Sequence, residues 1–89
     1  MPVSAESIEI ALRESIPITH LEVTDQSNGC GENYAVFIVS EIFVGKLPLA
    51  RHRLINELLK DQISQMHAFS QKHMTPKQYE AKLAAELGT

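Results

Sequence analysis

The stretch YAVFIV, residues 34–39, is apolar on both faces and rich in β-branched and aromatic side chains. A strand with two apolar faces is typical of the middle of a sheet, where neighbouring elements cover it. We therefore predict that residues 34–39 form a central strand and that the other elements pack around it.

Upstream of this stretch the sequence predicts a helix and a second strand. Ser4 is suited to cap a helix that ends before Pro17, because its hydroxyl accepts a hydrogen bond from the first helical turn. Leu21 and Val23 then alternate with polar residues, which is typical of a half-buried strand. Residues 25–33 are polar and contain glycine, so we expect a loop there. The apolar residues at helical spacing in the first helix are Ile8, Ala11, Leu12 and Ile16.

Downstream the sequence predicts a bend, a long helix and a third strand. We expect residues 42–45 to form the bend. Pro48 is suited to the first turn of a helix that continues to Ile63, with apolar residues three and four positions apart. Residues 66–72 are predicted to form the third strand.

A last helix is predicted from its start signal. Residues 75–78, TPKQ, form a capping box with proline at the first helical position. Tyr79, Leu83 and Leu87 lie four residues apart and form an apolar stripe. Gly88 is the expected stop.

The predicted order is α-β-β-α-β-α, which favours an α+β sandwich of two layers, with helices on one face of a three-stranded sheet. The second strand, the long helix and the third strand form a crossover unit. This unit favours a parallel pair, so we expect a mixed sheet. No repeat, linker or low-complexity segment interrupts residues 1–89, and we expect a single domain.

The composition argues against several classes of protein. The chain has 89 residues, 44% of them hydrophobic, and a formal net charge of -3. Nucleic-acid phosphates and anionic membrane surfaces attract clustered positive charge. The negative net charge therefore argues against a protein that coats nucleic acid or binds a membrane surface. No apolar run approaches the roughly 20 residues that span a bilayer. A single cysteine cannot form an internal disulfide, and we expect a soluble, intracellular protein in a reducing compartment.

The single cysteine and one histidine together suggest half of a metal site. Cys30 lies in the segment NGCG, residues 28–31, and His67 follows later in the chain. The glycines leave room for a bulky group to approach the sulfur. Thiolate and imidazole both ligate iron-sulfur clusters, so the remaining ligands would come from a partner. From these residues alone, Cys30 as an ordinary thiol and His67 as a solvent-facing strand residue stay open as alternatives.

Four segments resemble the signature of the BolA family: FVGK at 43–46, LARHRLIN at 49–56, HAF at 67–69 and TP at 75–76. The resemblance runs over nearly the whole chain and implies a class II KH-like fold, in agreement with the predicted element order. The loop cysteine and Lys72 resemble the eukaryotic cytosolic and nuclear branch, whose members partner monothiol glutaredoxins. Tyr79 stands where many members carry tryptophan, and it keeps an aromatic anchor.

The resemblance implies a non-enzymatic adaptor that forms a heterodimer with a monothiol glutaredoxin. In the implied complex His67 and Cys30 are metal ligands of a bridging 2Fe-2S cluster, with His67 the safer assignment. The glutaredoxin supplies a cysteine and its bound glutathione a second thiol. The implied role is iron sensing or cluster delivery in the cytoplasm, with the nucleus as a second location. No membrane attachment is expected, and the apo form is expected to be a monomer.

Two other functions stay open at this stage. A KH-like fold with exposed cations raises nucleic-acid binding by a transcriptional regulator, although the chain lacks the Gly-x-x-Gly loop of KH modules. An enzyme is disfavoured, because no third group is evident that would orient Cys30 and His67 as nucleophile and base. The candidate residues of a partner surface, or of a weak DNA-binding surface, are Lys46, Arg51, His52, Arg53 and Lys72.

The other histidines are expected to be structural or solvated. His52 lies between two arginines on the long helix and is expected to pack or to hydrogen-bond a loop. His20 and His73 are predicted to be solvated. His73 is also close enough in sequence to His67 to serve as a substitute ligand.

Overall fold

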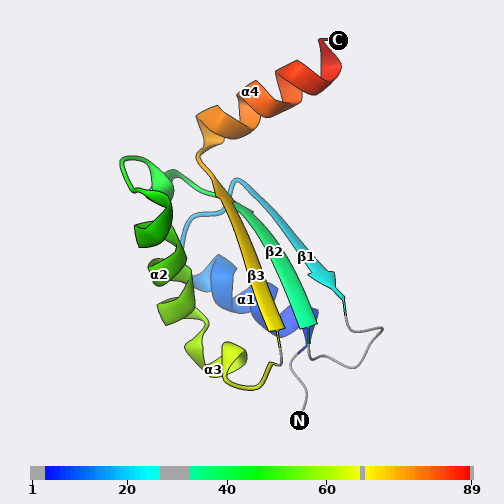
Figure 1. The fold of residues 1–89 in the computed structure, drawn as a ribbon, viewed down its shortest axis with the longest axis vertical. Helices are drawn as coiled ribbons and strands as arrows, with labels where there is room; N and C mark the ends of the chain where they lie inside the picture. The colour runs from blue at the N-terminus through cyan, green and yellow to red at the C-terminus, as the bar shows by residue number, and fades with distance from the viewer. Residues whose placement is uncertain (1–3, 27–32, 67, 89) are drawn as a thin grey trace.

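The structure, a computed structural model, describes residues 4–26, 33–66 and 68–88 (Figure 1). Its sheet contains three strands, β1 (His20–Asp25), β2 (Asn33–Val39) and β3 (Ala68–Met74). Strand β2 lies in the middle, antiparallel to β1 and parallel to β3. The predicted central position of residues 34–39 and the predicted mixed sheet are both confirmed.

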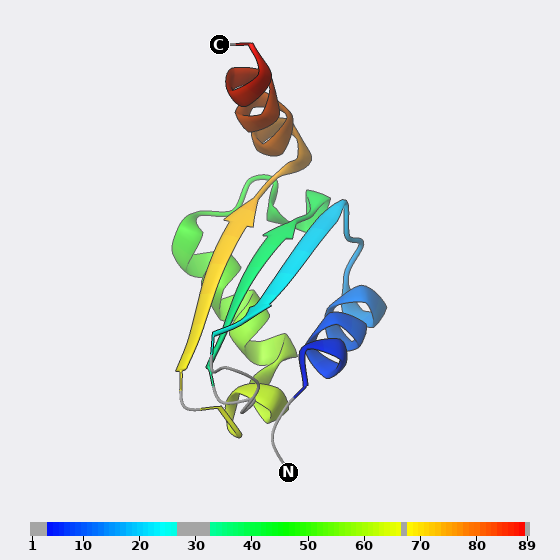
Figure 2. The ribbon, with the colours of Figure 1, turned by 90° about the vertical axis from the view of Figure 1, so that its right-hand side faces the viewer.

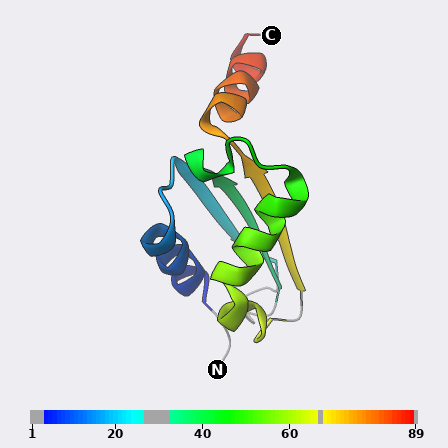
Figure 3. The same ribbon diagram turned by 90° about the vertical axis from the view of Figure 1, so that its left-hand side faces the viewer.

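Helices α1 (Ala5–Ser15) and α2 (Pro48–Leu58) cover one face of this sheet, while the other face is open (Figures 2 and 3). Helix α1 begins at the predicted cap, where the N–H of Ser7 donates to Ser4 Oγ at 3.1 Å. The α+β two-layer sandwich is thereby confirmed. The buried core between the layers consists of Ile8, Leu12, Ile16, Tyr34, Val36, Ile38, Phe43, Ile55 and Leu59.

The predicted bend and long helix differ in detail from the structure. The bend is a 3-10 helix, η1 (Glu41–Phe43), followed by a turn in which Gly45 has a φ of 77°. That backbone conformation favours glycine. The predicted helix to Ile63 is interrupted: α2 ends at Leu58, and a short α3 (Lys60–Ile63) follows. Leu59, at the break, is fully buried, so the apolar periodicity continues across it and hides it in the sequence.

Strand β3 runs later in the chain than the predicted range of 66–72. It includes His73 and Met74, and Met74 pairs with Val39 of β2. Met66 belongs instead to the turn after α3, where its N–H donates to the Ile63 carbonyl at 3.0 Å. The end of this strand is set by its pairing with β2, which local sequence does not encode.

Helix α4 (Pro76–Leu87) has its predicted capping box, because Thr75 and Gln78 exchange hydrogen bonds at 2.9 and 3.2 Å. It does not join the other helices on the sheet, and the expectation that all helices share one face is wrong for α4. The helix extends beyond the end of the sheet (Figures 1–3), and Leu87 is 85% exposed. Tyr79 anchors its first turn by stacking on His20, with ring centroids 4.8 Å apart.

The prediction that His73 is solvated is wrong. Its ring is half-buried between α2 and β3, 5.1 Å from the Phe43 ring and 6.2 Å from the His52 ring, measured between centroids. His73 Nε2 lies 2.7 Å from Gln71 Oε1, and the Gln71 amide donates to Asn56 Oδ1. His20 is likewise not simply solvated, because Tyr79 stacks on it.

Burial is the main cause of the lowered pKa of His73. Loss of hydration, together with the neighbouring His52 and the Arg51 guanidinium, lowers the pKa of His73 to about 4. The ring is therefore neutral at pH 7.

Replacing Ile38 with alanine tests the core. Ile38 is fully buried on the central strand, so Ile38→Ala is expected to reduce the free energy of unfolding by about 2–5 kcal/mol. Urea unfolding measures this change. Val44, which is 64% exposed, provides the control, and Val44→Ala is expected to change stability by less than about 0.5 kcal/mol. Similar losses in both variants would contradict the assigned core.

The lowered pKa of His73 predicts a pH dependence of stability. The unfolded state takes up this proton near the ordinary pKa of about 6.5, and the folded state only near 4. The contribution of neutral His73 is therefore present above about pH 6.5 and is lost as the pH falls toward 4. His73→Gln, which cannot titrate, is expected to flatten this part of the stability profile. An unchanged profile, or an NMR titration midpoint of His73 near 6.5, would contradict the assignment.

Candidate functional site

The end of β1 and the beginnings of β2 and β3 lie at the same end of the sheet (Figure 1). Asn33, the first residue of β2, pairs with Ala68, the first residue of β3. Cys30 lies in the connection between β1 and β2, and His67 directly precedes β3. Both candidate ligands lie outside the described residues. The described residues that flank them meet at one end of the sheet.

One polar atom at this end lacks a partner within the described part of the chain. Asn33 Oδ1 is buried, and no described residue donates a hydrogen bond to it. A buried acceptor without a donor costs about 1–3 kcal/mol. A thiolate and an imidazole are ligands that suit an iron-sulfur cluster. By residue type alone, Cys30 and His67 would suit such a group, and their neighbours in the sequence lie at this end of the sheet.

The described side chains do not form a complete metal site by themselves. Within residues 4–26, 33–66 and 68–88, no three histidine, cysteine, aspartate or glutamate side chains gather where they could hold a metal ion. His20 and His73 pair with Val39 and Ile38 of β2, near the end of the sheet opposite Asn33. His52 neighbours His73. The described histidines are thus remote from the end that adjoins His67.

The predicted cationic residues of α2 have unequal surroundings. Arg51 Nε donates to the Lys46 carbonyl at 2.9 Å, and Arg51 also donates to Gln78 Oε1 at 3.2 Å. Arg51 therefore links α2 to the first turn of α4. His52 and Arg53 are exposed on α2, as is Lys46 in the preceding turn. All four residues lie in or just before the first turns of α2, but Arg51, His52 and Arg53 follow one another on the helix and so point in different directions.

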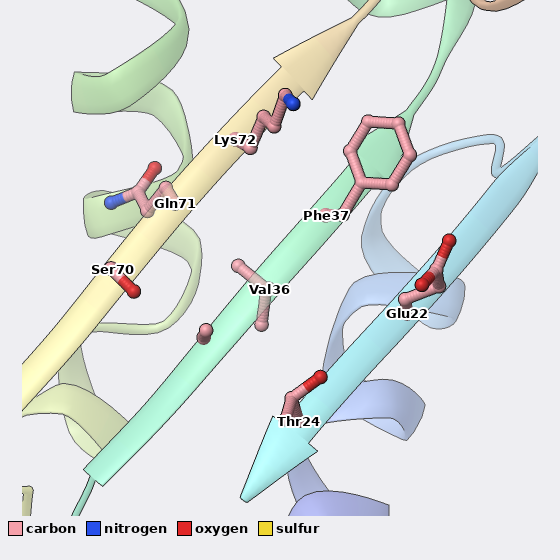
Figure 4. A pocket seen from close by; sticks show the side chains of 8 residues that line it. Glu22, Thr24, Val36, Phe37, Ser70, Gln71 and Lys72 are labelled. Atoms are coloured by element: carbon pink, nitrogen blue, oxygen red, sulfur yellow. The ribbon is translucent and has the colours of Figure 1, made fainter. Parts of the chain in front are cut away.

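Lys72 lies apart from these four residues. Its side chain lies on the open face of the sheet, with the ammonium 5.7 Å from the centroid of the Phe37 ring (Figure 4). Helix α2 covers the opposite face (Figure 3). The structure thus separates the predicted partner surface into two parts, on opposite sides of the sheet.

The open face carries a shallow hollow of about 220 Å³ that the sequence analysis missed (Figure 4). Glu22, Phe37 and Lys72 form one row across the three strands, and the next row contains Thr24 and two smaller residues. The signal in the sequence is the polar residue at every second position of β1, whereas in β3 the four consecutive polar residues 70–73 hide which face is open. This face presents an acid, an aromatic ring and a base side by side.

No described helix is long and apolar enough to cross a membrane.

Comparison with known proteins identifies the family. A family model described as BolA-like protein matches residues 12–78. Protein BOLA2 of Arabidopsis thaliana is 42% identical over 78 residues, which cover 86% of this chain and 84% of the relative. BolA-like protein 2 of Mus musculus is 41% identical over 80 residues, covering 89% of this chain and 93% of the relative.

Solved structures agree with these relatives. A bol-like protein from Babesia bovis superposes with a TM-score of 0.84 at 42% identity, covering 91% of this chain and 94% of that structure. Yeast Fra2 superposes with a TM-score of 0.76 at 34% identity, covering 97% of this chain and 94% of that structure. The predicted BolA-like fold is confirmed. The chain belongs to the BolA-like protein family, and its similarity to the BolA-like protein 2 relatives is consistent with the eukaryotic branch that its sequence resembles.

Proposed function

We propose that this chain is a non-enzymatic adaptor, acting in the cytoplasm or nucleus, that binds a monothiol glutaredoxin and co-ligates a bridging 2Fe-2S cluster. His67 and Cys30 are the proposed ligands. The observation that carries the proposal is the pairing of Asn33 with Ala68. Since Cys30 precedes Asn33 by three residues and His67 directly precedes Ala68, the chain connects both candidates to one end of the sheet. Membership of the BolA-like family supports the same proposal.

The number of available ligands explains why a partner is needed. A 2Fe-2S cluster is held by four ligands, commonly thiolates, with histidine replacing cysteine in some proteins. This chain contains a single cysteine. Under the proposal, a cysteine of the glutaredoxin and the thiol of its bound glutathione complete the set. A neutral imidazole in place of a thiolate removes negative charge from the site, which favours a higher reduction potential.

The positions of the other histidines favour His67 over His73. His73 lies five residues beyond Ala68 on β3, which is about 16 Å along an extended strand. Its ring is also held by Gln71 and packed against Phe43. Use of His73 as a substitute ligand would require both contacts to break and the strand to move. His67 directly precedes Ala68 in the sequence, at the end of the sheet where Asn33 pairs.

The nucleic-acid alternative gains no support from the structure. Arg51 is engaged by the Lys46 carbonyl and by Gln78, and Lys72 lies on the opposite face from α2. Nucleic acid is bound by cations that act together along one surface. Binding to DNA therefore stays a prediction, which salt-dependent retention of the chain on DNA would test.

Formation of the shared cluster is the direct test of the proposal. The chain is mixed without oxygen with a monothiol glutaredoxin, iron, sulfide and glutathione, and visible circular dichroism and native mass are recorded. We expect a one-to-one complex whose spectrum differs from that of the glutaredoxin homodimer, because an imidazole replaces a thiolate. Absence of both the complex and the spectral change would remove the proposal.

Ligand variants rank the two proposed ligands. His67→Ala is expected to abolish most of the visible cluster signal, whereas Cys30→Ala retains a larger share, because glutathione or solvent replaces a ligand on a loop more easily. His73→Ala is the matched control and is expected to leave the signal intact. Equal loss in the His67 and Cys30 variants would refute the ranking, and loss in the His73 variant would refute the assignment of His67.

A further inference from the structure

The outer edge of β3 exposes a row of main-chain groups. Strand β3 forms one side of the sheet, with no described strand beyond it (Figure 2). The Met74 carbonyl accepts from the N–H of Ser40, the residue that follows β2, at 3.1 Å. The main chain of Met74 therefore points toward β2. Main-chain groups of successive strand residues point to alternate sides, so those of Phe69, Gln71 and His73 point to the free edge.

These outward groups have no partner within the described part of the chain. No hydrogen bond among the described residues uses the main-chain N–H or C=O of Phe69, Gln71 or His73. The row extends over about 13 Å of strand. Such a row of donors and acceptors is a ready template for another strand.

The edge of β3 also lacks the usual protection against pairing. Proteins protect edge strands with charged residues, prolines and bulges. Strand β3 contains neither proline nor glycine, and Lys72 is its one Asp, Glu, Lys or Arg residue. The opposite edge strand, β1, carries the carboxylates of Glu22 and Asp25 within six residues. The two edges of the sheet therefore differ, and β3 is the one that favours pairing.

We infer that the free edge of β3 binds an extended segment of the cluster-sharing partner, which adds a fourth strand to the sheet. This inference rests on the proposed function. A strand added to β3 lies about 4.8 Å away, so its main chain passes beside the start of β3, next to His67 in the sequence. The partner has to approach this end of the sheet to supply its own ligands. An acidic side chain of the segment would complement Lys72 on the open face.

Amide hydrogen exchange tests the inference residue by residue. The unlabelled apo form of a monothiol glutaredoxin is added to the ¹⁵N-labelled chain. The amides of Phe69, Gln71 and His73 are expected to exchange at least tenfold more slowly in the complex. The amides of Ser70 and Lys72 face β2 and are expected to be protected already in the free chain.

A pair of substitutions at one residue isolates the main-chain contact. Gln71→Pro removes an N–H that points to the free edge, and proline is tolerated at such edge positions. Gln71→Ala keeps this N–H, and both variants lose the side-chain contacts with Asn56 and His73. Gln71→Pro is expected to bind the glutaredoxin at least tenfold more weakly than Gln71→Ala.

The outcomes separate this inference from the proposed function. A complex that forms without slower exchange at Phe69, Gln71 and His73, and with equal affinity for both Gln71 variants, overturns the edge assignment and leaves the shared cluster standing. Slow exchange of these amides in the free chain that depends on its concentration means that a second copy occupies the edge, which also overturns the inference. Failure of any complex to form overturns both proposals.

Discussion

The double pairing of β2 is the constraint on which the rest of the structure depends. Its side chains Val36 and Ile38 are buried under the helices, while its main chain bonds to strands on both sides. A shift of one residue in its register would turn the buried side chains to the open face. The register is therefore fixed by the core, and it sets Asn33 opposite Ala68. The position of the candidate site follows from packing elsewhere in the molecule.

Only one face of the sheet is covered by the described helices (Figures 2 and 3). With 89 residues the chain has enough apolar surface for one small core, and α1 and α2 use it on one side of the sheet. Within the described ranges, no layer covers the open face, the outer edge of β3 or most of α4 (Figure 2). Helix α4 is held by contacts with segments far from it in the sequence, such as the stacking of Tyr79 on His20 and the hydrogen bond from Arg51 to Gln78.

The sequence predicted those features that depend on neighbouring residues. The caps at Ser4 and Thr75 and the apolar stretch of β2 are local signals, and the structure agrees with them. The break at Leu59 was not predictable, because the same residue continues the apolar spacing and fills the core. The burial of His73 and the direction of α4 depend on contacts between distant segments, which residue patterns do not encode. Cys30 and His67 could be selected as candidates from residue type and family resemblance, whereas their arrangement could not.

If the chain supplies only half of the cluster ligands, as proposed, a surface that binds the partner before the cluster arrives would help to assemble the site. If an extended partner segment binds along β3, the partner's ligands are held near the beginning of that strand before any cluster arrives. Ligation by the second protein then becomes an intramolecular event, governed by an effective concentration rather than by a new encounter. The described histidines lie toward the other end of the sheet, so they would not compete for the proposed cluster at this position. Under the proposal, the site shared between the two proteins lies at the end where β2 and β3 begin.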